Sequence, residues 1–302
     1  MCGTGVSGIT KLQIDIPPRK QWENGHGYCG ETSIQAIVCI FVALYYGSWI
    51  SQNIIRQING GEVLIGIGSD KRTLNTLLFN YLEWNYNKEK QPQYKQYCVW
   101  LKQNLIKKYP CIITAYLYGE KDEDYDHIMP VIGIDYQSKD VYDDNDVIYF
   151  HNLFQNQITQ RRLDTMMSTR KSCKKDVFDG GCIPKDVTYG LAITGIIDNS
   201  HSTLPVRLYI NSWDEPNVSL GSKSKLLQGT VVVSNLIPNQ KYVLLRYDTY
   251  KTVPTSGNES KFLNSKYDYR YDFQANGDTW TFNDPNHFPS NGSTYYRCVK
   301  FV

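Results

Sequence analysis

The spacing of apolar residues along the chain changes once, at Cys111, and this change limits the folds that the chain can adopt. Before this point apolar residues recur at helical spacing, which predicts helices over residues 34–45, 51–58, 73–84 and 94–108. After it, short runs rich in β-branched and aromatic residues stand between acidic, Asn and Gly turns. Helices come first and strands follow, so we expect an α+β fold rather than the alternation of a doubly wound sheet.

The strands fall into two groups. The first group follows Cys111 and completes a mixed domain over residues 1–160. From residue 187 no helical period remains, and short strands bounded by Asn, Gly and Pro predict an all-β sandwich over residues 187–302. The run TVVVSNLIPNQKYVLLRY resembles the central hairpin of a fibronectin type III-like module. Residues 161–186 are polar and irregular, and we expect them to connect the two domains.

Composition and charge exclude several functions. The 302 residues suffice for two domains, and 32 basic against 30 acidic residues leave a net charge of +2, so we expect no nucleic-acid partner. No stretch reaches the roughly 18 apolar residues that a membrane helix needs, so we expect no membrane span. The first residues lack the basic and apolar regions of a secretory signal, which leaves the compartment open.

Cysteines and glycosylation sequons add indications of environment. Cys173 and Cys182 bracket a short loop with a Gly-Gly turn, which fits a local disulfide or equally two free thiols. The eight cysteines form no CxxC pair, so we expect no zinc site, and the chemistry below needs no other cofactor. Sequons begin at Asn217, Asn258 and Asn291. Such triplets also arise by chance in an Asn-rich chain, and they favour a secreted or vacuolar glycoprotein.

Cys29 is the candidate nucleophile. It stands where the first helix is expected to begin, within the Gly-rich turn ENGHGYCGE. The N–H groups and partial positive charge of a helix N-terminus stabilise a thiolate, and also the oxyanion that follows its attack on a carbonyl. A buried structural thiol is the alternative. The flanking Gly27 and Gly30 favour an exposed, backbone-lined site instead.

A cysteine nucleophile needs a histidine base, and the chain has five histidines. His127 opens an apolar strand directly after the acidic run EKDEDYD, so we expect its ring at the edge of a sheet. An ordinary surface histidine at a strand start is the alternative. His26 precedes Cys29 in the turn and is interpreted as a bystander, and His201 and His287 belong to the sandwich.

The group that orients the imidazole is expected on the next strand. Asn152 stands at the end of YFHN, and an antiparallel neighbour would bring its side-chain oxygen beside the Nδ1–H of His127. His151 then points to the opposite face of the sheet, because side chains alternate along a strand.

Four motifs follow one another in the chain: Gln21, Tyr28-Cys29-Gly30-Glu31, Asp126-His127-Ile128 and His151-Asn152. Their order resembles the papain-like superfamily and, within it, the C39-like peptidases. The resemblance covers about residues 15–160, and the fibronectin-like tail matches more loosely. It implies a papain-like fold with Cys29 as nucleophile, His127 as base and Asn152 as the orienting group. Gln21 and the Cys29 N–H would be the oxyanion donors.

One spacing departs from the family pattern. In most papain-like enzymes the glutamine lies six residues before the cysteine, whereas Gln21 precedes Cys29 by eight. A bulge in the Gly-rich turn can absorb two residues, so Gln21 remains the candidate. The resemblance implies a cysteine peptidase that hydrolyses amide bonds of a peptide or protein substrate through a thioester acyl-enzyme.

Two other functions fit the same residues. An acyl transferase would use the same cysteine and histidine with an amine acceptor in place of water. A catalytically inactive papain-like protein would serve as a binding or structural glycoprotein, although it would not need Cys29, His127 and Asn152 intact. In each of these functions the C-terminal sandwich would recognise a substrate, a surface or a protein partner.

Overall fold

The structure is a computed structural model, and the described residues fall into two compact units. The first unit comprises Met1–Gln21 and Tyr81–Thr194, and the second comprises Trp22–Asn80 and Gly195–Val302. The described residues are 8–21, 27–45, 47–63, 68–88, 90–118, 127–175, 179–196, 202–210 and 224–301. His26, Asp126, His201 and the sequon at Asn217 lie outside these ranges.

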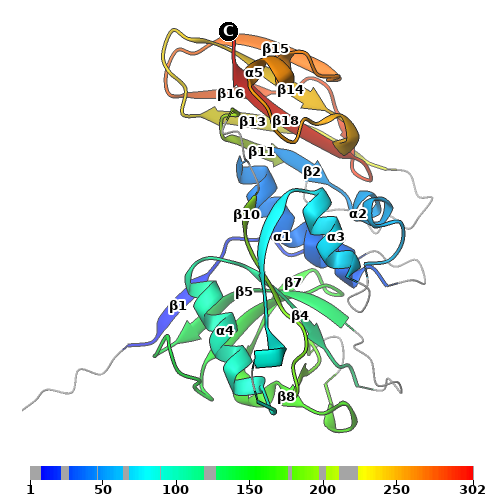
Figure 1. Cartoon of the computed structure of the whole chain (residues 1–302), viewed down its shortest axis with the longest axis vertical. Helices are drawn as coiled ribbons and strands as arrows, with labels where there is room; N and C mark the ends of the chain where they lie inside the picture. The colour runs from blue at the N-terminus through cyan, green and yellow to red at the C-terminus, as the bar shows by residue number, and fades with distance from the viewer. Residues whose placement is uncertain are drawn as a thin grey trace, which may run out of the picture. The chain divides into compact units, whose positions relative to one another are not determined.

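The first unit is built on a seven-stranded sheet in the order β3-β10-β4-β5-β6-β7, with β1 beside β5 (Figure 1). Its strands are β1 (Thr10–Gln13), β3 (Phe79–Glu83), β4 (Cys111–Ala115), β5 (His127–Tyr136), β6 (Val147–Asn152), β7 (Gln157–Arg162) and β10 (Leu191–Ile196). The pairs of β5 with β1, β4 and β6 are antiparallel, as are β6 with β7 and β10 with β4. One boundary between the units falls within β3 and another within β10.

The helix α4 (Tyr94–Ile106) packs on this sheet. It contributes Tyr97 and Leu101 to a core that also holds Met129 and Val131 of β5. Short elements complete the unit: η1 (Tyr86–Lys88), η2 (Leu163–Thr165), β8 (Met167–Ser168), η3 (Arg170–Ser172) and β9 (Ile183–Pro184). Cys173 and Cys182 form a disulfide, which decides between the two alternatives that the sequence left open.

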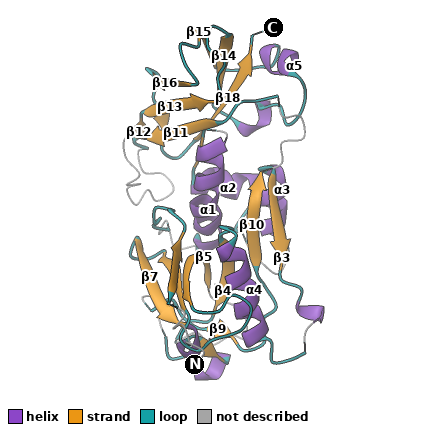
Figure 2. Cartoon of the chain, turned by 90° about the vertical axis from the view of Figure 1, so that its left-hand side faces the viewer, coloured by secondary structure: helices purple, strands orange, loops and turns teal. Residues whose placement is uncertain are grey.

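The second unit combines helices with two antiparallel sheets that share one hydrophobic core (Figure 2). The longer helices are α1 (Cys29–Tyr45), α2 (Gln52–Asn59) and α3 (Ser69–Thr76). One sheet has the order β11 (Val206–Ile210), β13 (Gly229–Ser234), β16 (Thr279–Asn283). The other has the order β15 (Tyr269–Gln274), β14 (Lys241–Tyr247), β18 (Ser293–Lys300), β2 (Ser48–Ile50). Smaller elements are β12 (Leu226–Leu227), η4 (Tyr250–Thr252), α5 (Glu259–Leu263) and β17 (Phe288–Pro289).

Helices and antiparallel sheets together agree with the expected α+β class. Local signals are confirmed at several element ends. α1 begins at Cys29, and Ser51 caps α2 by accepting a hydrogen bond from the N–H of Ile54 at 3.3 Å. Gly60 closes α2 in the left-handed conformation, with φ of 76°.

The helix expected over residues 73–84 is wrong beyond Thr76. α3 ends there, Leu78 takes the left-handed φ of 61°, and Phe79 starts β3. A branched residue at positive φ cannot continue a right-handed helix, and the following residues pair with β10 in the sheet. Pairing with a strand distant in the sequence has overridden the helical spacing of this segment.

The two units group residues differently from the expected domains 1–160 and 187–302. β2 pairs with β18, and Trp49 lies in the core that the two sheets of the second unit share, where its Nε1–H donates to the Ser290 carbonyl at 3.1 Å. β10, expected in the sandwich, pairs with β4 through Leu191 and Ile112. Residues 161–186, expected to connect the domains, carry β8, β9 and the disulfide of the first unit.

No helix within the described ranges is both long and apolar enough to span a bilayer.

Candidate functional site

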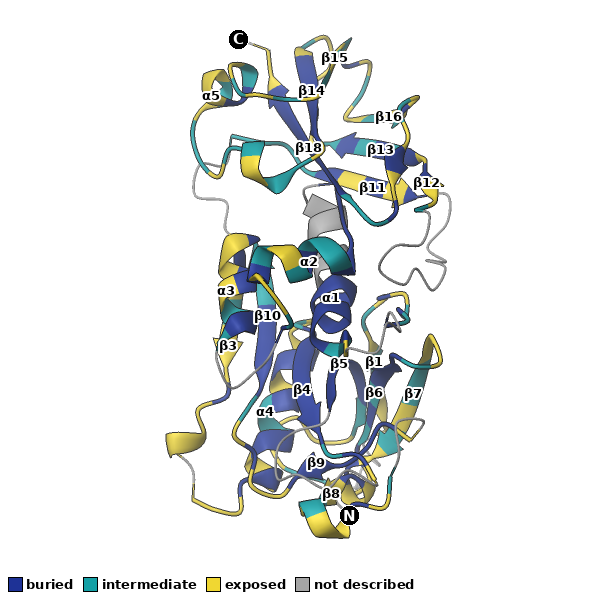
Figure 3. Ribbon diagram, turned by 90° about the vertical axis from the view of Figure 1, so that its right-hand side faces the viewer, coloured by how far each residue is buried: buried dark blue, intermediate teal, exposed yellow. Residues whose placement is uncertain are grey.

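Cys29 is the first residue of the 17-residue helix α1, and its half-buried side chain carries a thiol rather than half of a disulfide. Residues 30–37, the part of α1 after Cys29 whose burial is described, are buried (Figure 3). Gly30 is required by close packing, because a β-carbon there would lie 2.5 Å from the carbonyl oxygen of Val63. The thiol therefore stands at the positive end of a helix whose first turn is tightly packed.

A partly buried ion pair holds the residues on either side of this thiol. Arg56 donates from Nε to the carboxylate of Glu31 at 2.7 Å, and a second N–H reaches the carbonyl of Gly27. Its guanidinium carbon lies 3.7 Å from the centre of the Tyr28 ring. Burial raises the pKa of Glu31, and the hydrogen bond from Arg56 opposes this effect. Arg56 thereby ties together the residues that precede and follow Cys29.

His127 is the first residue of β5 and is only 3% exposed. It pairs with Ala115 of β4, and its ring centre lies 5.1 Å from that of Phe154. Burial lowers the pKa of His127 to about 4. The imidazole is therefore neutral at neutral pH, which is the form that can accept a proton from a thiol.

The β6–β7 turn gathers three of the sequence-predicted site residues within the first unit. The backbone N–H of Gln21 donates to the carbonyl of Leu153 at 2.8 Å. Phe154 lies against His127, and Asn152 opens the turn at the end of β6. Cys29 belongs to the second unit.

Asn152 uses its side chain within this turn. Its Oδ1 accepts hydrogen bonds from the N–H groups of Phe154 and Gln155, both at 3.1 Å, and its Nδ2 donates to the side chain of Gln155. These bonds engage the oxygen that the sequence assigned to the imidazole of His127. Asn152 therefore fixes the turn that carries Phe154 against His127, and a direct bond to Nδ1–H stays a prediction.

Strand alternation puts His127 and Asn152 on one face of the sheet. Phe150 pairs with Val131, and His127 and Val131 are four residues apart on β5, so all three side chains share a face. Asn152 is two residues from Phe150 on β6 and faces the same way. His151 points to the other face.

His151 has a structural role there. It is fully buried, and its Nε2–H donates to the carbonyl of Ile16 at 3.1 Å. Burial lowers its pKa to about 4. Gln21 is also buried, at 7% exposure, and its Oε1 has no hydrogen-bond partner among the described residues. Its role as an oxyanion donor stays a prediction.

Sequence reasoning missed Phe154 and Arg56. Phe154 is one apolar residue among several in the run YFHNLF, and its contact with His127 depends on the β5–β6 register. Arg56 lies in a separate helix from Cys29, and no local pattern relates it to Glu31. A single sequence holds no signal for either contact.

Across the described part of the chain, no group of three or more His, Cys, Asp and Glu side chains is arranged to hold a metal ion. Comparisons with protein-family models, with curated proteins and with solved structures found no match.

Proposed function

We propose that this chain is a cysteine peptidase with a papain-like, C39-like catalytic arrangement, and that it hydrolyses amide bonds of a peptide or protein substrate. One observation carries the proposal. A half-buried thiol stands at the start of a long helix, and a buried, neutral imidazole stands at the start of a strand. A helix N-terminus favours a thiolate, and a neutral imidazole is the form that can accept the proton of a thiol.

The proposed reaction has two steps. His127 takes the proton of Cys29, the thiolate attacks the carbonyl carbon, and His127 returns the proton to the departing amine. This leaves a thioester, which water hydrolyses with His127 again as base, so that the product acid leaves and the thiol is restored. The helix N-terminus and the side chain of Gln21 would stabilise the oxyanion in both steps.

Asn152 supports this chemistry by holding the turn that places Phe154 on His127. An apolar ring beside the imidazole keeps water away and preserves its neutral form. The sandwich of the second unit is proposed to recognise the substrate, a surface or a protein partner.

The disulfide supports a location outside the cytosol. Disulfides persist in oxidising compartments, and Cys173 and Cys182 form one in this chain. The exposed Asn258 of one sequon is accessible for glycosylation in such a compartment. We therefore propose a secreted or vacuolar protein.

Hydrolysis of a library of internally quenched peptides tests the proposal. Wild type should cleave a subset of peptides, Cys29→Ala should abolish cleavage, and His151→Gln should retain it because His151 lies on the opposite face of the sheet. Hydroxylamine added as acceptor separates the two enzymatic functions, because a transferase would form hydroxamates in preference to free acids. Cleavage that persists in Cys29→Ala would contradict the proposal.

A further inference from the structure

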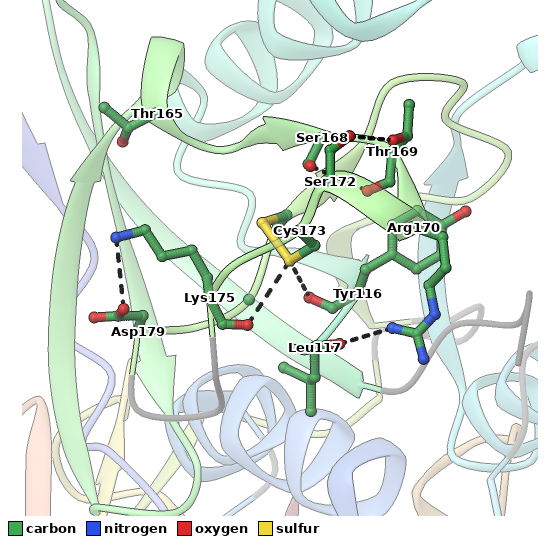
Figure 4. The surroundings of a disulfide bond; sticks show 12 residues. Tyr116, Leu117, Thr165, Ser168, Thr169, Arg170, Ser172, Cys173, Lys175 and Asp179 are labelled. Atoms are coloured by element: carbon green, nitrogen blue, oxygen red, sulfur yellow. Dashed lines mark hydrogen bonds and ion pairs between the residues drawn. A yellow bond between two sulfur atoms is a disulfide. The ribbon is translucent and has the colours of Figure 1, made fainter. Parts of the chain in front are cut away.

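The loop closed by the Cys173–Cys182 disulfide is bonded to the end of β4. Cys182 and Tyr116 exchange two backbone hydrogen bonds, of 2.9 and 2.8 Å, and the Tyr118 N–H donates to the carbonyl of Lys175 at 2.7 Å. The sulfur of Cys173 lies 3.3 Å from the carbonyl oxygen of Tyr116 (Figure 4). Both described parts of this disulfide loop are thereby tied to the same strand end.

The Gly-Gly turn of the disulfide loop packs directly on the sheet. Gly180 lies against the ring of Phe150, where an added β-carbon would clash. A β-carbon at Gly181 would lie 2.3 Å from the carbonyl oxygen of Tyr116 and 3.2 Å from the β-carbon of Ala115. The φ angles of the two glycines, 76° and 65°, are in the left-handed region that favours glycine. No other residue type would allow this approach.

This turn covers the sheet face that carries His127. Ala115 pairs with His127 and Phe150 pairs with Val131, and directly paired side chains in antiparallel strands share a face. His127 and Val131 also share a face because they are four residues apart. The Gly-Gly turn therefore packs on the same face of the sheet as the imidazole, which is 3% exposed.

Arg161 of β7 holds the turn in place. Its guanidinium donates to three backbone carbonyls, those of Asp179 at 2.9 Å, Gly181 and Thr165. Nη1 donates to the carbonyls of Asp179 and Gly181, and Nη2 donates to that of Thr165. The side chain therefore fixes the position of the turn relative to β7. The disulfide and Arg161 are thus two independent ties on one segment.

We infer that the disulfide loop and Arg161 position the His127 imidazole for the proposed peptidase reaction. The reaction therefore requires the disulfide between Cys173 and Cys182, while Cys29 stays a thiol. The catalytic part of this inference rests on the proposed function. A dithiol reductant would break the S–S bond, leave two thiols in the chain and itself become a disulfide. Both sulfurs belong to residues that are 4% exposed, so mild thiols should keep Cys29 reduced and leave this bond intact.

Proton NMR of the histidine ring protons as a function of pH tests the inference without a substrate. Signals of His127 are identified with His127→Gln, and wild type is compared with Cys173→Ser/Cys182→Ser and with Arg161→Met, which keeps the disulfide. In both variants the pKa of His127 should rise from about 4 by roughly one unit or more toward the value of an exposed imidazole. His151, on the other face, should keep its pKa of about 4.

A matched control replaces Lys175 by Met. Its ion pair with Asp179 spans the same loop at 3.5 Å, with both side chains more than two-fifths exposed, so its loss should leave His127 unchanged. An unchanged pKa of His127 in the double variant would overturn the inference. An equal rise for His151 would also overturn it, because the loop would then support the whole sheet. Failure of the proposed peptidase function would instead appear in the separate peptide-cleavage assay.

Discussion

Acid should destabilise the first unit through its buried histidines. His151 is fully buried, and burial lowers its pKa from 6.5 to about 4. As the pH falls below 6.5 the unfolded chain gains a proton on this residue, whereas the folded chain resists protonation until about pH 4. The stability contributed by the neutral imidazole is therefore present above pH 6.5 and is lost as the pH falls toward 4.

The size of this loss follows from the two pKa values. The difference between 6.5 and about 4 corresponds to about 3.4 kcal/mol once the pH lies below both values. Between pH 7.5 and pH 4.5 the loss is already about 2.5 kcal/mol for one such histidine. His127 has the same pKa of about 4, so the two together account for about 5 kcal/mol of acid destabilisation.

Urea unfolding of wild type and His151→Gln at these two pH values tests the reasoning. The glutamine amide keeps a donor for the carbonyl of Ile16 but cannot titrate, so the variant should lose about 2.5 kcal/mol less than wild type on acidification. At pH 7.5 the difference in the free energy of unfolding between wild type and His151→Gln reports the packing change alone. Equal losses in the two proteins would refute a depressed pKa for His151.

Two further predictions concern the packing around the helix start and the core. Gly30→Ala should lower the free energy of unfolding in urea by about 1–3 kcal/mol, because its β-carbon would meet the Val63 carbonyl. Gly27→Ala should have little effect, because nothing lies within 4 Å of its β-carbon. Lys102→Met should cost about 3–5 kcal/mol, because it leaves the buried carboxylate of Asp146 without its ion-pair partner. Thermal unfolding with an unchanged midpoint for Lys102→Met would contradict the second prediction.

Local patterns in the sequence predicted the elements that local chemistry determines. The helix that begins at Cys29, the helix over residues 51–58 and the strand that His127 opens all appear about where they were expected. These signals depend on residues a few positions apart, which is the range over which helical and strand periods act. The placement of Cys29 at a helix start and of His127 at a strand start was predicted for the same reason.

Contacts between distant segments could not be predicted from these patterns. β2 pairs with β18, although 247 positions separate Ser48 from Tyr295 in the chain. The ring of Phe154 beside His127 and the packing of the Gly-Gly turn on the sheet depend on sheet register. Register is set by the packing of the whole sheet, which a single sequence does not display.

Other thiols in the chain provide an internal reference for the reactivity of Cys29. Burial raises the pKa of Cys98, Cys111 and Cys298, so these thiols should react slowly with electrophiles. An N-terminal helix position and a histidine base should instead make Cys29 react fast.

Alkylation by iodoacetamide at about pH 6, with the modified cysteine identified by mass spectrometry, measures this difference directly. We expect Cys29 in wild type to react about 10 to 100 times faster than the buried thiols, His127→Ala to slow it by about tenfold or more, and His151→Gln to leave it unchanged. If Cys29 reacts no faster than the other thiols, or if His127→Ala leaves its rate unchanged, Cys29 and His127 do not form a catalytic pair.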